Sequence, residues 1–146
     1  MKNFKNKRIS FIKQQLNMIK GVGIDLIEKR RIRNIVSRFG NKFVDRVLTE
    51  SEKVDYLSRK GVDKKVSFLS NNFASKEAAS KALGTGFSEG ITLKTIEVLR
   101  RSNGSPYLNL VGEAKKRAKE MGYKNFKLSI SDTSDLSIAF VIGEGK

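Results

Sequence analysis

One stretch near the middle of the chain restricts the fold more than any other. Residues 73–86 read Phe-Ala-Ser-Lys-Glu-Ala-Ala-Ser-Lys-Ala-Leu-Gly-Thr-Gly, a helix-forming run that ends in glycines. At helical spacing its small residues form one stripe, which consists of Ser75, Ala78, Ala79 and Ala82. Small side chains allow a close approach between elements. The stripe therefore predicts a long central helix held tightly against a sheet or another helix, with Gly84 at its C-terminal cap.

Two charged residues lie on this helix away from the small stripe. Glu77 and Lys81 are four residues apart and share a face, but such a pair is common on solvated helices and contributes only about 0.2–0.5 kcal/mol. Asp25 is harder to explain, because it lies in residues 20–27, where apolar residues alternate as in a strand. A carboxylate in such a segment costs free energy unless it is paired or binds a metal ion.

Composition limits the chemistry that this chain can perform. Its 146 residues include no cysteine and no histidine, which excludes disulfides, thiolate metal sites and serine–histidine catalysis. Any metal ion must be bound by oxygen, which favours Mg²⁺, Ca²⁺ or Mn²⁺ over zinc or copper. No apolar run approaches the ~20 residues of a membrane-spanning helix. We expect a cytoplasmic protein, and the lack of cysteine fits a reducing compartment.

The formal net charge is +15. Such a charge attracts polyanions, whether nucleic acid, an acidic protein or a phosphorylated ligand, and does not choose among them. Residues 1–17 carry basic side chains and no acidic one. We expect them to be a basic N-terminal extension that can be disordered, with a short docked helix as the alternative. Residues 18–146 are expected to form a single domain.

Periodicity predicts the order of the elements. A strand over residues 20–27 precedes a helix over 28–39, and the capping-box pattern at 49–52 predicts another helix ending near Gly61. The elements predicted after the central helix are strands over 94–101 and 107–111, a helix over 112–122, and two alternating strands on either side of a polar tip at 132–135. This order predicts an α+β fold in which a largely antiparallel sheet packs against the long central helix.

Several motifs, taken in order, resemble those of the holo-(acyl-carrier-protein) synthases, the small bacterial 4'-phosphopantetheinyl transferases. Residues 21–26 resemble the N-terminal motif of these enzymes, and residues 73–86 resemble their central signature. Residues 103–107 are similar to a turn of the same family, and residues 129–133 to its C-terminal hairpin motif. The resemblance runs from about Met18 to the end and implies a 4'-phosphopantetheinyl transferase-like fold.

The resemblance also implies an activity and a site. Members of the family move the 4'-phosphopantetheine arm from coenzyme A to a serine of apo acyl carrier protein, in fatty acid biosynthesis, and adenosine bisphosphate leaves. By matching positions, Asp25 and Glu77 would bind Mg²⁺ and, with Lys81, form the catalytic group. Lys81 would neutralise developing charge or help to deprotonate the serine. The further cofactor contacts implied are Lys76, Ser80, Gly84, Asp132 and Thr133.

Some positions depart from the family pattern. Asp132 stands where some members have histidine, so its expected role is a hydrogen bond to the base or ribose of the nucleotide. Asn72 stands where an arginine is common, and Ser105 where a lysine is common. Both changes remove positive charge from expected cofactor contacts and leave the metal site unaffected.

A basic cluster near the first helix suggests how a partner binds. Carrier proteins are strongly acidic, and opposite potentials speed encounter and set register. The residues expected to bind the carrier are Arg31, Arg38, Lys42 and Arg46, although a solvated basic face is the alternative for any one of them. The resemblance further implies a homotrimer. The rival interpretation is a small basic RNA-binding protein, but the aromatic residues lie mostly at core-like spacings; a scaffold without activity is a third.

Overall fold

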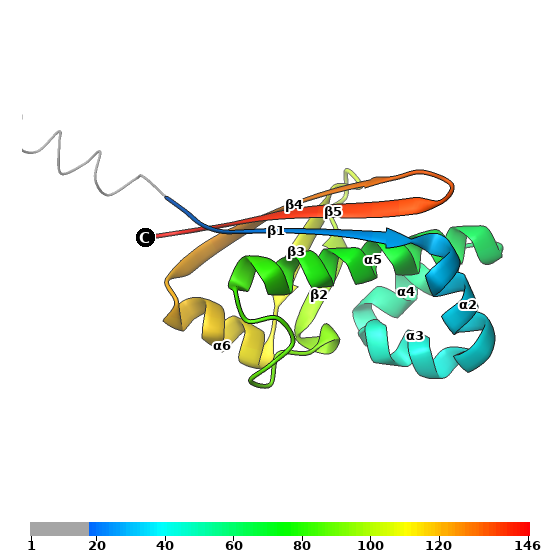
Figure 1. Ribbon diagram of the computed structural model, residues 1–146, viewed down its shortest axis with the longest axis horizontal. Coiled ribbons are helices and arrows are strands. Elements are labelled where there is room, and N and C mark those ends of the chain that lie inside the picture. The colour runs from blue at the N-terminus through cyan, green and yellow to red at the C-terminus, as the bar shows by residue number, and fades with distance from the viewer. Residues whose placement is uncertain (1–17) are drawn as a thin grey trace, which may run out of the picture.

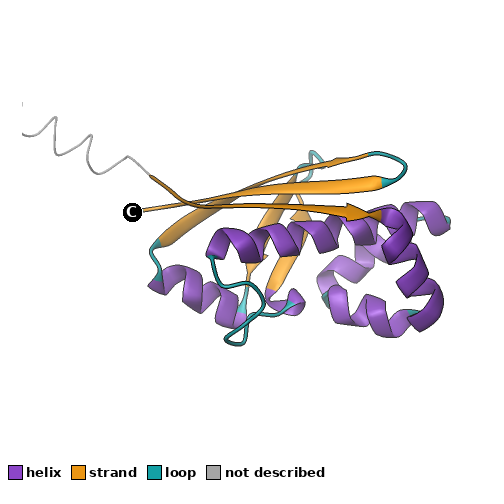
Figure 2. Cartoon of the chain, in the orientation of Figure 1, coloured by secondary structure: helices purple, strands orange, loops and turns teal. Residues whose placement is uncertain are grey.

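The computed structural model describes residues 18–146, and the expectations for residues 1–17 lie outside that range. The elements in chain order are β1 (Met18–Glu28), α2 (Lys29–Phe39), α3 (Asn41–Val47), α4 (Glu50–Ser58), α5 (Val62–Leu83), the 3-10 turn η1 (Leu93–Thr95), β2 (Ile96–Arg100), β3 (Pro106–Leu110), α6 (Gly112–Glu120), β4 (Tyr123–Asp132) and β5 (Leu136–Gly145) (Figure 1). The α+β class is confirmed, and Figure 2 distinguishes the helices from the strands by colour.

The strands form two antiparallel sheets rather than one. The larger sheet has the order β1-β5-β4, and the smaller one pairs β2 with β3. In the larger sheet the central strand β5 pairs with both neighbours; Asp25 of β1 lies opposite Ala139, and Ile130 of β4 lies opposite the same residue. The predicted hairpin is therefore formed by β4 and β5. The strand predicted over 94–101 begins only at Ile96, because Leu93–Thr95 form the 3-10 turn.

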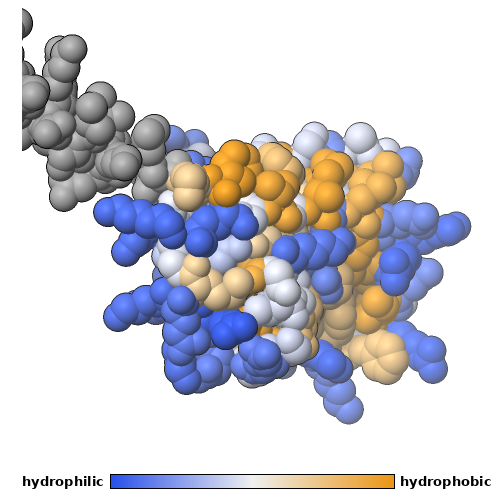
Figure 3. All heavy atoms as spheres, turned by 60° about the vertical axis from the view of Figure 1, so that its left-hand side comes forward, coloured by the Kyte–Doolittle hydropathy of each residue, from blue (hydrophilic) through white to orange (hydrophobic). Residues whose placement is uncertain are grey.

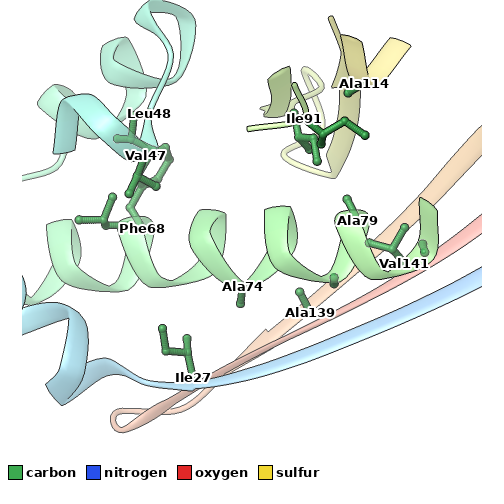
Figure 4. Packing of buried hydrophobic residues seen from close by; sticks show 14 of the residues in the cluster. Ile27, Val47, Leu48, Phe68, Ala74, Ala79, Ile91, Ala114, Ala139 and Val141 are labelled. Carbon is green, nitrogen blue, oxygen red and sulfur yellow. The ribbon is translucent and has the colours of Figure 1, made fainter. Parts of the chain in front are cut away.

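Helix α5 lies between the larger sheet and the remaining elements (Figure 1). On the sheet side, Ala74 of α5 points toward Ile27 and Ala139, and on the opposite side Phe68 lies near Val47 and Leu48 (Figure 4). The four residues of the small stripe are all buried, as predicted. Such a helix has few exposed positions, so packing fixes the backbone positions of the polar residues that it does expose. Within residues 18–146, no helix is long and apolar enough to cross a bilayer.

Local sequence sets the boundaries of the first helices. Gly40 adopts a positive φ of 56° and separates α2 from α3, so the basic residues on either side do not share one helix. The predicted capping box is present: the Glu52 N–H donates to the Thr49 hydroxyl, and the Glu52 carboxylate accepts from the Thr49 N–H. The helix that it begins ends at Ser58, slightly before the expected position.

The face of the larger sheet that points away from α5 is apolar and exposed. Its exposed side chains are Val22, Ile24, Leu26, Leu136 and Phe140. Figure 3 shows apolar atoms gathered along the upper side of the molecule, where Figure 1 places this sheet. Because soluble monomers rarely expose large contiguous apolar patches, this outer sheet face is a candidate protein contact surface.

Candidate active site

Two glycines allow α5 to lie directly on β1. A Cβ atom at Gly21 would overlap the carbonyl oxygen of Ala82, and one at Gly23 would overlap that of Ala78. No side-chain layer separates the strand from the helix at this crossing. The next residue of β1 on the same face is Asp25, which is thereby brought beside the part of α5 that carries the predicted charged residues.

The three predicted catalytic residues lie together at this crossing. The Lys81 ammonium donates to the Asp25 carboxylate, with Nζ 3.0 Å from Oδ1, and to the carbonyl oxygen of Ile24 at 2.9 Å. The Asp25 side chain is 18% exposed and that of Lys81 is 51% exposed, so the pair faces solvent from a partly buried base. The structure therefore joins side chains that are more than fifty positions apart in the sequence.

Glu77 completes the group. Burial raises the pKa of Glu77 above its ordinary value; the Asp25 carboxylate raises the pKa further, and Lys81 lowers it. Two carboxylates that repel each other in this way favour a cation between them. A shifted carboxyl group in a partly open site is also typical of functional positions.

The donor set fits Mg²⁺ and no metal that requires several protein ligands. Mg²⁺ typically takes one or two carboxylates and fills its shell with water and phosphate oxygens. Within residues 18–146, no group of three or more Asp, Glu, His or Cys side chains is placed to hold a metal ion. An ion bound by Asp25 and Glu77 would therefore complete its shell with oxygens from water or from a ligand such as a phosphate.

The structure contradicts two implied cofactor contacts, and the first of them is that of Lys76. Its side chain is fully buried, and its ammonium donates to the carbonyl oxygens of Val47 (2.5 Å) and Leu93 (2.8 Å) and to Glu52 Oε2 (2.7 Å). An ammonium has three protons, and all three are used. Lys76 supports α5 beside Glu77 and is not available to a phosphate.

Ser80 is likewise turned inward. It is buried, and its hydroxyl donates to the Glu77 carbonyl oxygen at 2.8 Å, so the expected contact of this hydroxyl with a cofactor is contradicted. Gly84 is exposed and caps α5 in the left-handed conformation, with φ of 75°, as predicted. Asn72, where the family often has arginine, is buried, and its amide donates to Glu52 Oε1 at 3.4 Å.

The β4–β5 tip borders a cavity of about 510 Å³. Asp132 lines this cavity, while the Thr133 hydroxyl accepts the N–H groups of Asp135 (3.2 Å) and Leu136 (3.1 Å) within the turn. The other lining residues are Arg59, Asp63, Lys64, Ser67, Phe68, Asn71 and Arg100. Ser67 precedes Glu77 by ten residues on α5, which corresponds to about 15 Å along the helix.

The cations of this cavity, called here the tip cavity, were not predicted from the sequence. Burial lowers the pKa of Arg100, and the charge of Arg59 lowers it further. An anionic ligand would offset the repulsion between these two guanidinium groups. No local pattern singles out Arg59, Lys64 or Arg100 among the many basic residues, because they come together only when α4, α5 and β2 pack.

The four residues predicted to bind a partner are all exposed. Arg31 and Arg38 lie on α2, and Lys42 and Arg46 lie on α3. None of these side chains forms an ion pair with another residue in the described part of the chain, whereas Arg33 nearby is paired with Asp63. The Arg38 guanidinium lies 5.2 Å from the ring centroid of Phe39, which is half exposed.

Comparisons with known proteins show the family to which this chain is related. The model of the 4'-phosphopantetheinyl transferase superfamily matches residues 21–141. The holo-[acyl-carrier-protein] synthase of Maridesulfovibrio salexigens is 42% identical over 127 residues, which is 87% of this chain and 99% of that protein. The crystal structure of the Neisseria meningitidis holo-[acyl-carrier-protein] synthase matches with a TM-score of 0.80 at 32% identity, over 86% of this chain and 98% of that one. The Bacillus anthracis synthase, in complex with CoA (3',5'-ADP), matches with a TM-score of 0.74 at 35% identity, over 88% and 99%.

Proposed function

The chain belongs to the 4'-phosphopantetheinyl transferase superfamily, and we propose that it is a holo-(acyl-carrier-protein) synthase. It transfers the 4'-phosphopantetheine arm of coenzyme A to a serine of apo acyl carrier protein in fatty acid biosynthesis. The serine oxygen forms the new bond to phosphorus and gives up its proton to solvent water, while the phosphorus–oxygen bond of the pyrophosphate breaks and adenosine bisphosphate leaves with the electrons of that bond. The observation that carries this proposal is the grouping of Asp25, Glu77 and Lys81 where β1 crosses α5.

Asp25 and Glu77 are proposed to hold Mg²⁺. When bound, the ion neutralises charge on the pyrophosphate of coenzyme A, which reduces repulsion of the serine oxygen and stabilises the leaving phosphate. The two carboxylates come from a strand and a helix that cross without intervening side chains. A rigid support of this kind suits a site whose geometry must be fixed before the ligand arrives.

Lys81 is proposed to stabilise charge rather than to act as a base. Its ammonium donates hydrogen bonds to Asp25 and to the carbonyl oxygen of Ile24, and an ammonium has no lone pair with which to accept the serine proton. Because the side chain is half exposed, the ammonium can turn toward a phosphate that enters the site. A charge-assisted hydrogen bond to a phosphate oxygen is stronger than a neutral one, and it is directed where negative charge develops.

The nucleotide end of coenzyme A is proposed to enter the tip cavity. The cavity combines the cations Arg59, Lys64 and Arg100 with Asp132 at the hairpin tip, where the sequence resemblance implied a nucleotide contact. The Thr133 hydroxyl keeps its own proton for a ligand, since it only accepts within the turn. Gly84, exposed beyond Lys81, is proposed to border the bound cofactor on the other side.

The carrier protein is proposed to dock on α2 and α3. The four exposed cations Arg31, Arg38, Lys42 and Arg46 have no internal ion-pair partner in residues 18–146. Cations that are not neutralised internally supply the positive potential that an acidic carrier needs for steering. The reaction is expected in the cytoplasm, where coenzyme A and the carrier meet.

A homotrimer is proposed through the outer sheet face. Five large apolar side chains of β1 and β5 are exposed there, which is unusual for a monomer. We also keep the proposal that residues 18–146 are a single transferase domain, which the match of the family model over residues 21–141 supports. The RNA-binding alternative has no support in the comparisons.

One assay tests the activity. The protein is incubated with coenzyme A, Mg²⁺ and apo carrier protein, and the carrier is then weighed by mass spectrometry. We expect the added mass of one phosphopantetheine group, and Asp25→Asn or Glu77→Gln should remove most of the turnover. An unmodified carrier, under conditions in which a known synthase modifies it, would refute the proposed function.

A further inference from the structure

Lys29 joins segments that lie far apart in the sequence. It is the first residue of α2 and only 6% exposed, and its backbone N–H donates to the carbonyl oxygen of Asp135 at 2.8 Å. Its ammonium donates to Asp132 Oδ2 at 2.6 Å, to the carbonyl oxygen of Thr133 at 2.5 Å and to the Ser67 hydroxyl at 2.9 Å. The residue thus fastens the β4–β5 tip to α5, and all three ammonium protons are used by protein oxygens.

Asp132 needs such a partner because of the cavity that it lines. The tip cavity collects three cations, as a site for an anionic ligand should, yet two carboxylates also border it: Asp63, which is paired with Arg33, and Asp132. An unpaired carboxylate there would repel phosphate groups. Lys29 binds one carboxylate oxygen and offsets its charge, while the Asp132 side chain remains 37% exposed. The second oxygen is therefore free to accept a hydrogen bond from a ligand.

Lys29 lies between two cavities. On its other side Lys29 borders a second cavity of about 460 Å³. A shorter side chain would expose Asp132 to water from both cavities and release the tip from Ser67. A test variant should therefore keep the length of the lysine side chain while it removes the ammonium group with its charge and its hydrogen bonds, which methionine does closely.

We propose that Lys29 is a positioning residue for the nucleotide end of coenzyme A. It holds the hairpin tip against α5 and cancels the charge of Asp132, so that the tip cavity accepts a polyanion. Lys29 acts through Asp132 and does not contact the ligand. This inference rests on the proposed function, because that function supplies the ligand.

The test compares Lys29→Met, the double variant Lys29→Met/Asp132→Asn, and the control Lys116→Met, whose lysine makes an exposed ion pair on α6. The dissociation constant of coenzyme A is measured by calorimetry, and KM and kcat are measured with apo carrier and Mg²⁺. We expect Lys29→Met to weaken coenzyme A binding about tenfold and to raise KM similarly, with kcat at saturation nearly unchanged. Lys116→Met should match wild type.

The double variant is compared with Asp132→Asn alone, because Asp132 itself is a proposed nucleotide contact. If Lys29 acts by cancelling the charge of Asp132, Lys29→Met should weaken coenzyme A binding about tenfold in the wild-type background and about twofold or less in the Asp132→Asn background. If Lys29→Met weakens binding equally in both backgrounds, or if Lys29→Met itself binds like wild type, the inference is wrong. Should Lys29→Met fail to fold, Lys29→Gln takes its place in the same comparison. Wild-type protein that binds no coenzyme A would overturn the proposed function together with this inference.

Discussion

Removal of one partner from the buried ion pair between Glu52 and Lys76 should be among the most destabilising single changes in this protein. Both side chains are fully buried. Glu52 accepts hydrogen bonds from Lys76 at 2.7 Å, from the backbone N–H groups of Thr49 (2.7 Å) and Val98 (2.8 Å), and from the Asn72 amide. The carboxylate thus joins α4, α5 and β2 beneath the site that carries Glu77.

We expect Glu52→Gln to destabilise the fold by about 3–5 kcal/mol, because it leaves the Lys76 ammonium buried without its counter-charge. The glutamine keeps one acceptor oxygen and places an amide group where the second oxygen was. With an unfolding entropy of about 2.1 cal/mol/K per residue over the roughly 130 described residues, this corresponds to a fall in Tm of about 11–18 °C.

The assay is thermal unfolding followed by circular dichroism at a fixed protein concentration, since self-association makes Tm depend on concentration. Glu50→Gln is the matched control: Glu50 lies on the same helix and pairs with Lys53, but its side chain is exposed, so Tm should change little. The double variant Glu52→Gln/Lys76→Met should recover part of the loss, because it removes both buried charges. A Glu52→Gln protein with nearly unchanged Tm would show that the buried pair contributes nothing, contrary to this reasoning.

The remaining predictions concern the site and the surfaces. Glu77→Gln should remove most turnover yet leave the metal-free protein at least as stable at pH 7, as thermal unfolding can check, because ionised Glu77 is disfavoured by burial and by Asp25. For the same reason the folded metal-free protein holds the Glu77 proton to a higher pH than the unfolded chain, so its stability should fall as pH rises above about 4.5, and this slope should be absent in Glu77→Gln. Mg²⁺ binding, followed by calorimetry, should weaken as pH falls through the raised pKa of Glu77, because the ion requires the carboxylate. Arg31→Glu combined with Arg46→Glu should weaken carrier binding about tenfold or more and spare coenzyme A binding; unchanged carrier affinity would exclude α2 and α3 as the docking site. Ile24→Lys on the outer sheet face should shift the sedimentation mass from a trimer toward a single chain, whereas a wild-type protein that already sediments as one chain would contradict the assembly.

Local patterns were sufficient to predict the central helix and the strand that carries Asp25. The small stripe of α5 and the alternating strand around Asp25 each carry a repeat that a sequence displays directly, and their packing follows from the need to bury the stripe. The grouping of Asp25 with Glu77 and Lys81, however, was implied by resemblance and not by periodicity. Its physical basis is the missing Cβ atoms of Gly21 and Gly23, which the sequence gives no reason to connect with Ala78 and Ala82.

Residues whose role depends on distant partners could not be predicted in this way. Lys76 belongs to a polar motif and was expected to face a ligand, yet its partner Glu52 is 24 positions away and was recognised only as part of a capping box. No sequence pattern indicated a role for Lys29, because its partner Asp132 lies more than a hundred positions away. The division into two sheets likewise depends on which strand pairs with β3. The periodicity of a strand does not specify its pairing partner.

The direct seating of α5 on β1 has a mechanical consequence. Ile24 faces outward and Asp25 faces the helix, so one thickness of backbone separates the outer sheet face from the catalytic carboxylate. Because no layer of side chains lies between β1 and α5 at this crossing, a displacement of the strand is transmitted directly to the helix. Diluting the enzyme until the proposed trimer dissociates should therefore lower the rate per chain, even though each chain keeps its own Asp25, Glu77 and Lys81.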